Sequence, residues 1–547
     1  MSSHGGKGLI GDCAAGARPE LVPELPLLNN TPNKTTDCAL RCDSISRFFL
    51  GLGTRSFLGL LLSLLALSLA GCERTSESGS VTTVELRACR IRGIDTEVRC
   101  GDLEVPEQRL PATPTPARKI KIHFAVIHAL ARGKHLDPIF VFAGGPGQAA
   151  TSVGGLVQPL FARLNRERDI VLIDQRGTGG SNALQCEGDH GQGNPLSELD
   201  PSAQIAQLAG CAAELNKRGN DLTQYTTPIA VQDFEAVRSA LGYEQINLWG
   251  ASYGTRVELE YLRQFPDHVR TATLDGVAPS TLKLPISSAF EADQALDRLI
   301  SDCRSDAACS AKQPNFAARV DGLFARLAGG PIHATVLLPM TGQPRTLDVT
   351  RALVSNWVRA PLYSPVTASL IPDLIEKAAH EDFNPLITAS EAVNGEITES
   401  ISLGMHLSII CSEDMAHVSL SDVGSLESTR FGTAFFDQYK SLCAEWPRGR
   451  LPDHYFDPVT ASVPVLLLSG GLDPATPPHY AAQVLKTLTH GRSLVAPNLA
   501  HGISPQGCAP DLIDRFIRKA DPVALDAACL ERIPRPPFFQ AVTGEHS

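Results

Sequence analysis

Short, almost wholly apolar runs recur along the chain between longer stretches of helical periodicity. Runs of this length predict strands that are buried on both faces of a sheet. They lie at residues 138–142, 169–173, 246–249, 463–469 and 493–496, and we expect residues 271–276 to form a further strand after 246–249. Because these runs alternate with helical stretches, we expect an α/β fold with a mostly parallel sheet covered by helices on both faces.

Other parts of the chain have different patterns. Residues 84–91 and 96–105 predict a hairpin, and the alternating stretch 121–129 predicts a half-exposed strand. From about residue 287 to 438 the apolar spacing is mostly helical, which predicts an inserted helical cap. We therefore expect a core in two parts, residues 85–285 and 456–540, with the cap at residues 286–455.

The start of the chain carries targeting features. Residues 1–45 have no clear periodicity and predict a disordered extension. Arg47 and Arg55 then precede an apolar block at 57–69, as in a secretory signal. The block is too short for a comfortable membrane-spanning helix. An uncleaved anchor, an ordinary signal and a downstream non-ATG start are the alternatives.

The block ends in Leu-Ala-Gly-Cys at 69–72, which resembles the bacterial lipoprotein box. The resemblance implies a lipoprotein-type signal at 46–71, a lipidated Cys72 as the mature N-terminus, and a polar tether at 72–84. It also implies export and a lipid anchor in a bacterial membrane, in the periplasm or at the cell surface. Glu73 after the cysteine favours the outer membrane.

Composition and charge limit the classes of partner and cofactor that we expect. The formal net charge of −11 and the lack of a basic stripe argue against nucleic acid. An even number of cysteines follows Cys72, which predicts disulfides in an exported chain. The simplest pairing joins neighbours: Cys89–Cys100, Cys186–Cys211, Cys303–Cys309, Cys411–Cys443 and Cys508–Cys529. No Cys-x-x-Cys pair or Cys/His cluster has metal-ligand spacing, so we expect neither a metal nor a cofactor.

The apolar run at 246–249 leads into Gly-Ala-Ser-Tyr-Gly at 250–254, which matches the nucleophile elbow G-x-S-x-G. Small residues flank the serine, as a sharp strand-to-helix turn requires. The stretch after it is helical until Pro266. We therefore expect Ser252 to be a nucleophile at the start of a helix.

A serine nucleophile needs a base and an acid that orients the base. In α/β-hydrolases these partners follow the serine in the order acid, then histidine. Asp473 follows the strand predicted at 463–469, and His501 follows the one at 493–496. We therefore expect Asp473 to orient His501, and His501 to act as general base and acid.

The oxyanion of such a reaction needs two amide donors. The amide of Tyr253, directly after the nucleophile, is the first candidate. The turn Gly-Gly-Pro-Gly at 144–147 follows the strand predicted at 138–142, and Gly145 is the first choice there for the second donor.

Several segments together resemble the prolyl and tripeptidyl aminopeptidases of the α/β-hydrolase superfamily. The matching segments are residues 100–106, 144–147, 174–181 and 250–255 and those around Asp473 and His501. The family often has histidine before Gly-Gly-Pro-Gly, where this chain has Ala143. This departure weakens the substrate assignment more than the fold.

The resemblance implies an α/β-hydrolase fold and a serine exopeptidase that releases residues from free peptide N-termini. In that family, acidic cap residues hold the substrate ammonium, and Glu413, then Asp414, are the candidates here. A carboxylesterase on the same triad and a non-catalytic lipoprotein scaffold are the alternatives. The number of residues removed and the oligomeric state stay open.

Overall fold

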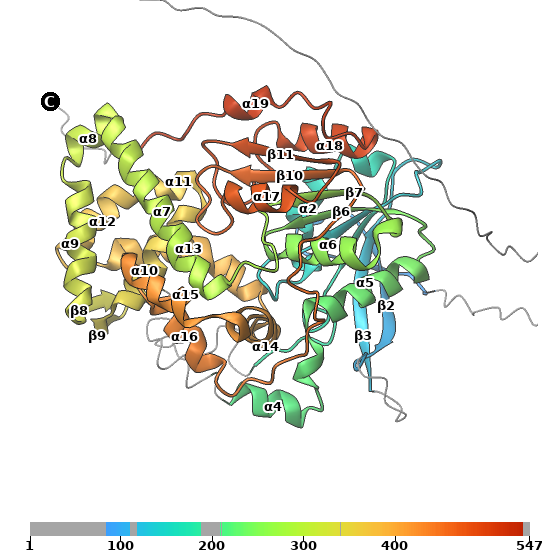
Figure 1. Cartoon of the computed structure of the whole chain (residues 1–547), viewed down its shortest axis with the longest axis horizontal. Helices are drawn as coiled ribbons and strands as arrows, with labels where there is room; N and C mark the ends of the chain where they lie inside the picture. Colours follow the sequence, from blue (N-terminus) through green and yellow to red (C-terminus); the bar gives the residue numbers. More distant parts are fainter. Residues whose placement is uncertain (1–83, 110–117, 187–207, 209, 340, 540–547) are drawn as a thin grey trace, which may run out of the picture. The chain divides into compact units, whose positions relative to one another are not determined.

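The computed structural model describes residues 84–109, 118–186, 208, 210–339 and 341–539 (Figure 1). The predicted extension, the signal segment, Cys72 and all of the tether but Val84 lie outside the described residues. Within the described ranges, no helix has both the length and the apolar character needed to cross a membrane.

Nine strands of the described chain form one sheet in the order β1-β2-β3-β5-β4-β6-β7-β10-β11 (Figure 1). The first four in that order pair antiparallel, and the rest pair parallel. Their bounds are β1 Arg87–Cys89, β2 Val98–Pro106, β3 Lys119–Ile127, β4 Ile139–Phe142, β5 Ile170–Ile173, β6 Ile246–Ala251, β7 Val269–Asp275, β10 Val465–Gly470 and β11 Gly491–Ala496. Each predicted strand is therefore present, and the mostly parallel sheet is confirmed.

Alternate residues of β4, β5, β6 and β10 enter two separate hydrophobic clusters. In β4, Phe140 and Phe142 belong to one cluster, and Ile139 and Val141 belong to the other. The first cluster includes side chains from α5 Thr227–Ala240, α6 Tyr253–Gln264 and α17 Pro478–Leu485, and also from α4 Cys211–Lys217 and α14 Leu403–Ile409. The second takes them from α2 Gly154–Leu160 and α18 Ala509–Lys519. Helices thus cover both faces, as the apolar strands predict.

The chain between β7 and β10 has a third hydrophobic cluster of its own. Its helices are α7 Leu284–Ser305, α8 Ala307–Lys312, α9 Phe316–Ala328, α10 Arg351–Arg359, α11 Pro365–Ala368, α12 Ile371–Ala379, α13 Asn384–Ser400, α14 Leu403–Ile409, α15 Leu420–Ser425 and α16 Ala434–Leu442. Two further helices, α4 Cys211–Lys217 and α19 Ala528–Glu531, lie outside this region in sequence. We call the chain between β7 and β10 the cap.

The cap also contains an antiparallel strand pair that the helical interpretation misses. Strand β8 (Ile332–Leu337) pairs with β9 (Pro344–Val349). Alternate residues of β8 are buried in the cap cluster, among them Ile332, Ala334 and Val336. This is the period-2 pattern of a half-exposed strand, but it is too short to stand out between long helices.

All five predicted disulfides are present. Cys89–Cys100 joins β1 to β2, and Cys303–Cys309 joins α7 to α8. Cys411–Cys443 joins the π-helical turn η6 (Ile410–Asp414) to the end of α16. Such bonds persist in oxidising compartments, so their number is consistent with an exported protein.

Candidate active site

Ser252 lies at a sharp strand-to-helix turn. Strand β6 ends at Ala251 and helix α6 begins at Tyr253, so Ser252 alone connects them. Its backbone has φ 58° and ψ −125°, a conformation that residues other than glycine rarely adopt. A Cβ atom at Gly254 would lie 2.2 Å from the carbonyl oxygen of Phe142, so the approach of α6 to β4 requires glycine there.

The end of β7 joins the serine turn to the loop that carries His501. The amide of Ser252 donates to the carbonyl oxygen of Asp275 at 2.8 Å. The Asp275 carboxylate accepts a hydrogen bond from the amide of Ser504 at 2.7 Å. A Cβ atom at Gly276 would lie 3.3 Å from Cε1 of His501. Ser252 and His501 therefore both lie beside the end of β7.

His501 and Asp473 are hydrogen-bonded to each other. Nδ1 of His501 lies 2.8 Å from Oδ2 and 3.0 Å from Oδ1 of Asp473. The carboxylate also accepts from the amides of Ala475 (2.8 Å) and Thr476 (2.9 Å) and from the Thr476 hydroxyl (2.9 Å). No sequence signal singles out Thr476, because threonine in a turn after aspartate is common. These donors fix the carboxylate that orients the imidazole.

The pKa values of Asp473 and His501 move in opposite directions. Burial acts to raise the pKa of the Asp473 carboxyl, but His501 and the amide donors hold it below its usual value. Burial acts to lower the pKa of the His501 imidazole, but Asp473 raises it above its usual value. An ionised Asp473 keeps the imidazole proton on Nδ1 and leaves Nε2 free to accept a proton.

Tyr363 of the cap packs against the histidine. The amide of His501 donates to the carbonyl oxygen of Tyr363 at 3.3 Å. Their ring centroids are 5.1 Å apart in an edge-to-face arrangement. Tyr363 ends the 3₁₀ turn η5 (Ala360–Tyr363), which directly follows α10. The sequence does not predict this contact, because it depends on how the cap folds back onto the core.

The two predicted oxyanion donors lie near Ser252. Tyr253 is its neighbour in sequence, and the turn that contains Gly145 lies near it in space. Tyr253 follows the serine directly, and a Cβ atom at Gly144 would lie 3.4 Å from Cβ of Ser252. Gly145 has φ +108°, which favours glycine. Neither the Tyr253 amide nor the Gly145 amide has a hydrogen-bond acceptor among the residues that the structure describes. Both are therefore free to donate to a substrate oxygen.

Residues 137–507, more than half of the chain, match the sequence profile of the alpha/beta hydrolase fold family. The sheet order and the strand–serine–helix turn fit that match. The chain belongs to the α/β hydrolase family. The predicted fold is therefore confirmed.

Named relatives of this α/β hydrolase include serine peptidases. Serine protease Hip1 of Mycobacterium tuberculosis (strain ATCC 25618 / H37Rv) is 25% identical over 505 residues, which cover 83% of this chain and 93% of that protein. Tripeptidyl aminopeptidases of Streptomyces coelicolor and Streptomyces lividans are 25% identical over 428 residues, which cover 72% of this chain and 76% and 77% of those proteins. The predicted resemblance to this peptidase family is confirmed.

The cap of this α/β hydrolase also contacts the Gly-Gly-Pro-Gly turn. Nδ1 of His406, on α14, lies 2.9 Å from the carbonyl oxygen of Pro146, and its Nε2 lies 2.7 Å from the hydroxyl of Tyr439. Burial lowers the pKa of His406, which favours the neutral ring. The chain has Ala143 before this turn, and an imidazole reaches the turn from the cap.

Glu413 lies in a buried polar cluster and not on an open surface. Its residue exposure is 1%, and it accepts from the amide (2.6 Å) and hydroxyl (2.9 Å) of Thr227 and from the hydroxyl of Tyr455 (2.5 Å). Burial raises the pKa of the Glu413 carboxyl, although the Arg256 charge opposes this. The hydroxyl of Thr227 also lies 2.7 Å from that of Tyr253, so the cluster extends to the residue after Ser252.

Asp414 pairs with the same arginine. Nη2 of Arg256 lies 3.1 Å from Oδ1 of Asp414, and its Nη1 lies 3.5 Å from Oε2 of Glu413. The Asp414 carboxylate also accepts from the amide of Leu284, the first residue of α7. Both acids that the sequence predicts as ligands of a substrate ammonium therefore already have a buried cationic partner.

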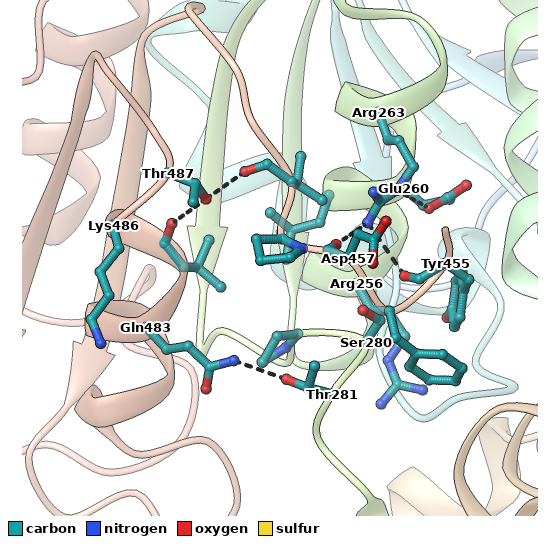
Figure 2. A pocket seen from close by; sticks show the side chains of 16 residues that line it. Arg256, Glu260, Arg263, Ser280, Thr281, Tyr455, Asp457, Gln483, Lys486 and Thr487 are labelled. Carbon is teal, nitrogen blue, oxygen red and sulfur yellow. Dashed lines mark hydrogen bonds and ion pairs between the residues drawn. The ribbon is translucent and has the colours of Figure 1, made fainter. Parts of the chain in front are cut away.

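A separate pocket of about 180 Å³ lies between α6 and α17 (Figure 2). Arg256 and Tyr455 line it, so it borders the buried cluster, whereas Thr227 is not among its lining residues. Gln483 of α17 donates to the hydroxyl of Thr281 at its edge (2.9 Å). Ser252, Asp473 and His501 are not among its lining residues, so it is distinct from the candidate active site.

Proposed function

We propose that this α/β hydrolase is an exported serine exopeptidase that releases residues from free peptide N-termini. The observation that carries the proposal is the His501–Asp473 pair, held on a loop that meets the Ser252 turn at the end of β7. Similarity to proteins named serine protease and tripeptidyl aminopeptidase supports peptide over other acyl substrates.

In the proposed reaction, Oγ of Ser252 attacks the scissile carbonyl carbon while Nε2 of His501 takes the hydroxyl proton. Asp473 stabilises the imidazolium that forms. The tetrahedral intermediate then collapses, the C–N bond breaks, and His501 returns the proton to the leaving amine. Water, activated by the same imidazole, hydrolyses the acyl-enzyme and restores Ser252.

The amides of Tyr253 and Gly145 are proposed to donate to the oxyanion. Tyr253 is the first residue of α6, so the positive end of the helix dipole also faces the developing charge. Loss of one such donor costs roughly a hundredfold to a thousandfold in rate. The close approach of Gly144 to Ser252, where an added Cβ atom would lie 3.4 Å from the serine Cβ, supports the second donor because it brings the turn near Ser252.

Recognition of the substrate ammonium is proposed for Glu413 first and Asp414 second. Because both acids are buried beside Arg256, an ammonium must approach the cluster where a hydroxyl now binds, at Tyr455 or Thr227. A carboxylate at a fixed distance from the nucleophile would then limit how many residues are released.

Export and a lipid anchor on Cys72 complete the proposal. The disulfides support an oxidising compartment. Metabolic labelling with a radioactive or alkyne fatty acid tests the anchor: the wild-type protein should take up label and partition with membranes, and Cys72→Ser should lose both. Equal labelling of Cys72→Ser would reject lipidation at this residue.

Matched peptides test the activity. We expect release of short N-terminal units from peptides with free N-termini and little turnover of the same peptides after N-acetylation. Mass spectrometry of the products gives the number of residues removed. Equal cleavage of both sets, or hydrolysis of p-nitrophenyl esters alone, would reject the exopeptidase and favour an esterase.

A further inference from the structure

Arg359 is a partly buried cation close to the candidate active site, and it forms no ion pair with the residues that the structure describes. It is the last residue of α10, where the helix dipole favours a positive charge. Its Nη2 donates to the hydroxyl of Tyr363, four residues along the chain. Its Nε is buried and has no acceptor among the described residues. A buried N–H without an acceptor is costly, so an absent acceptor is the natural explanation.

Two aromatic rings hold the guanidinium in place. Its central carbon lies 5.0 Å from the ring centroid of Tyr363 and 5.7 Å from that of Phe435, on α16. Contacts of this kind fix the plane of the guanidinium without consuming its hydrogen-bond donors. The side chain is therefore oriented in advance, with N–H groups still available.

The same tyrosine connects Arg359 to the histidine. The ring of Tyr363 lies 5.0 Å from the guanidinium carbon and 5.1 Å from the ring of His501. Burial and the charge of Arg359 both act to lower the pKa of His501, whereas Asp473 raises it. Burial raises the pKa of Tyr439 to about 12, and the Arg359 charge opposes that rise. The guanidinium is thus within electrostatic reach of two side chains around the candidate site.

We propose that Arg359 binds a carboxylate of the peptide substrate and makes this enzyme selective for acidic peptides. The inference rests on the proposed peptidase function and adds a substrate class to it. A planar guanidinium with free N–H groups matches a carboxylate in shape and charge, and such a pair forms two parallel hydrogen bonds. The carboxylate would provide the acceptor that Nε lacks.

The carboxylate that Arg359 binds belongs either to a side chain or to the C-terminus of the peptide, and matched peptides distinguish the two. The first set has a free N-terminus, an amidated C-terminus, and Glu or Gln at each of the first positions in turn. The second set is neutral in its side chains and ends in a free carboxylate or in an amide. Preference for Glu over Gln assigns a side-chain carboxylate, and preference for acid over amide assigns the C-terminal one.

For wild-type enzyme we expect kcat/KM for the preferred acid to exceed that of its isosteric amide roughly tenfold to a hundredfold, the usual effect of a charge-assisted hydrogen bond. Arg359→Gln should bring the ratio close to one, and Arg359→Lys should restore part of it. Arg345→Gln removes one positive charge from an exposed position of strand β9 and should keep the wild-type ratio.

Binding of the same peptides to Ser252→Ala, measured by calorimetry, tests the preference without turnover. The proposal would be overturned if the acid and amide peptides gave equal kcat/KM with the wild-type enzyme and equal affinity with Ser252→Ala. The peptidase function would still stand if neutral peptides were cleaved. An equal loss for acid and amide in Arg359→Gln would also overturn the proposal, because that result assigns Arg359 to the support of Tyr363. Acid-selective binding with no cleavage would support Arg359 and reject the peptidase function instead.

Discussion

The amide of Ser252 donates a 2.8 Å hydrogen bond to the carbonyl oxygen of Asp275. The carboxylate of the same aspartate accepts from the amides of Ile503 (3.0 Å) and Ser504 (2.7 Å), just beyond His501. One buried residue at the end of β7 therefore fixes the serine turn through its backbone and the histidine loop through its side chain. We therefore expect the distance between Ser252 and His501 to depend on Asp275, which takes no part in the proposed chemistry.

Asp275→Asn should lower both activity and stability. An asparagine side chain has one acceptor oxygen, so its NH₂ group faces an amide donor and one buried amide loses its partner. We expect unfolding free energy to fall by about 1–3 kcal/mol and kcat to fall more than KM changes. Thermal unfolding and steady-state kinetics measure the two effects. Asp267→Asn, at an exposed position, is the control, and an Asp275→Asn enzyme with wild-type kcat would refute the positioning role.

The pH profile of kcat/KM should rise through a pKa above the usual value for histidine, about 6.5. Asp473 raises the pKa of His501, so the neutral imidazole that accepts the serine proton forms only at higher pH. Asp473→Asn should shift the rising limb to lower pH and reduce kcat by roughly a thousandfold to ten-thousandfold. Asp526→Asn, which is exposed, should change neither. A limb that stays in place in Asp473→Asn would show that another group titrates there.

Glu413→Gln should raise KM for peptides with a free N-terminus and spare simple esters, if Glu413 holds the substrate ammonium. Loss of one charge from such a pair predicts about a tenfold or larger increase in KM. Glu427→Gln, on the exposed side of the cap, is the control. An equal loss on peptides and esters would instead assign Glu413 to the support of α6 through Thr227 and Tyr253. Unchanged peptide kinetics would remove both roles.

Replacement of Cys411 and Cys443 by serine should lower stability by about 2–5 kcal/mol. The bond ties the turn that carries Glu413 and Asp414 to the end of α16, so its loss also loosens the buried acids. The expected result is a lower Tm and a larger rise in KM than in kcat for peptides. An unchanged Tm in the double variant would show that hydrophobic contacts hold this turn without the disulfide.

Much of the core could be predicted because its strands are buried on both faces. Residues 138–142 and 463–469 are apolar almost throughout, and the observed strands β4 and β10 lie within those bounds or one residue beyond. The strand pair β8–β9 could not be predicted, because its short alternation of buried and exposed residues lies among helical segments. An element can therefore be predicted from the sequence when its own hydrophobic pattern is long enough to distinguish it from its neighbours.

Some residues of the candidate site could also be predicted from the sequence, and others could not. Ser252, Asp473 and His501 lie at the ends of predicted strands, so their order along the chain already indicates chemistry. Asp275 and Tyr363 have no such signal, since their roles arise from contacts between segments far apart in sequence. The resemblance to the aminopeptidases implies that Glu413 binds an ammonium, but the neighbouring residues in the sequence do not reveal Arg256 as its buried partner.

Labelling with a fluorophosphonate probe tests the central claim most directly, because such probes react with an activated serine whatever the substrate. The account predicts one labelled site per folded chain, located at Ser252 by mass spectrometry. Ser252→Ala should lose the label completely and keep the wild-type Tm. Absence of label on folded wild-type protein, or equal label on Ser252→Ala, would contradict a Ser252 nucleophile activated by His501 and Asp473.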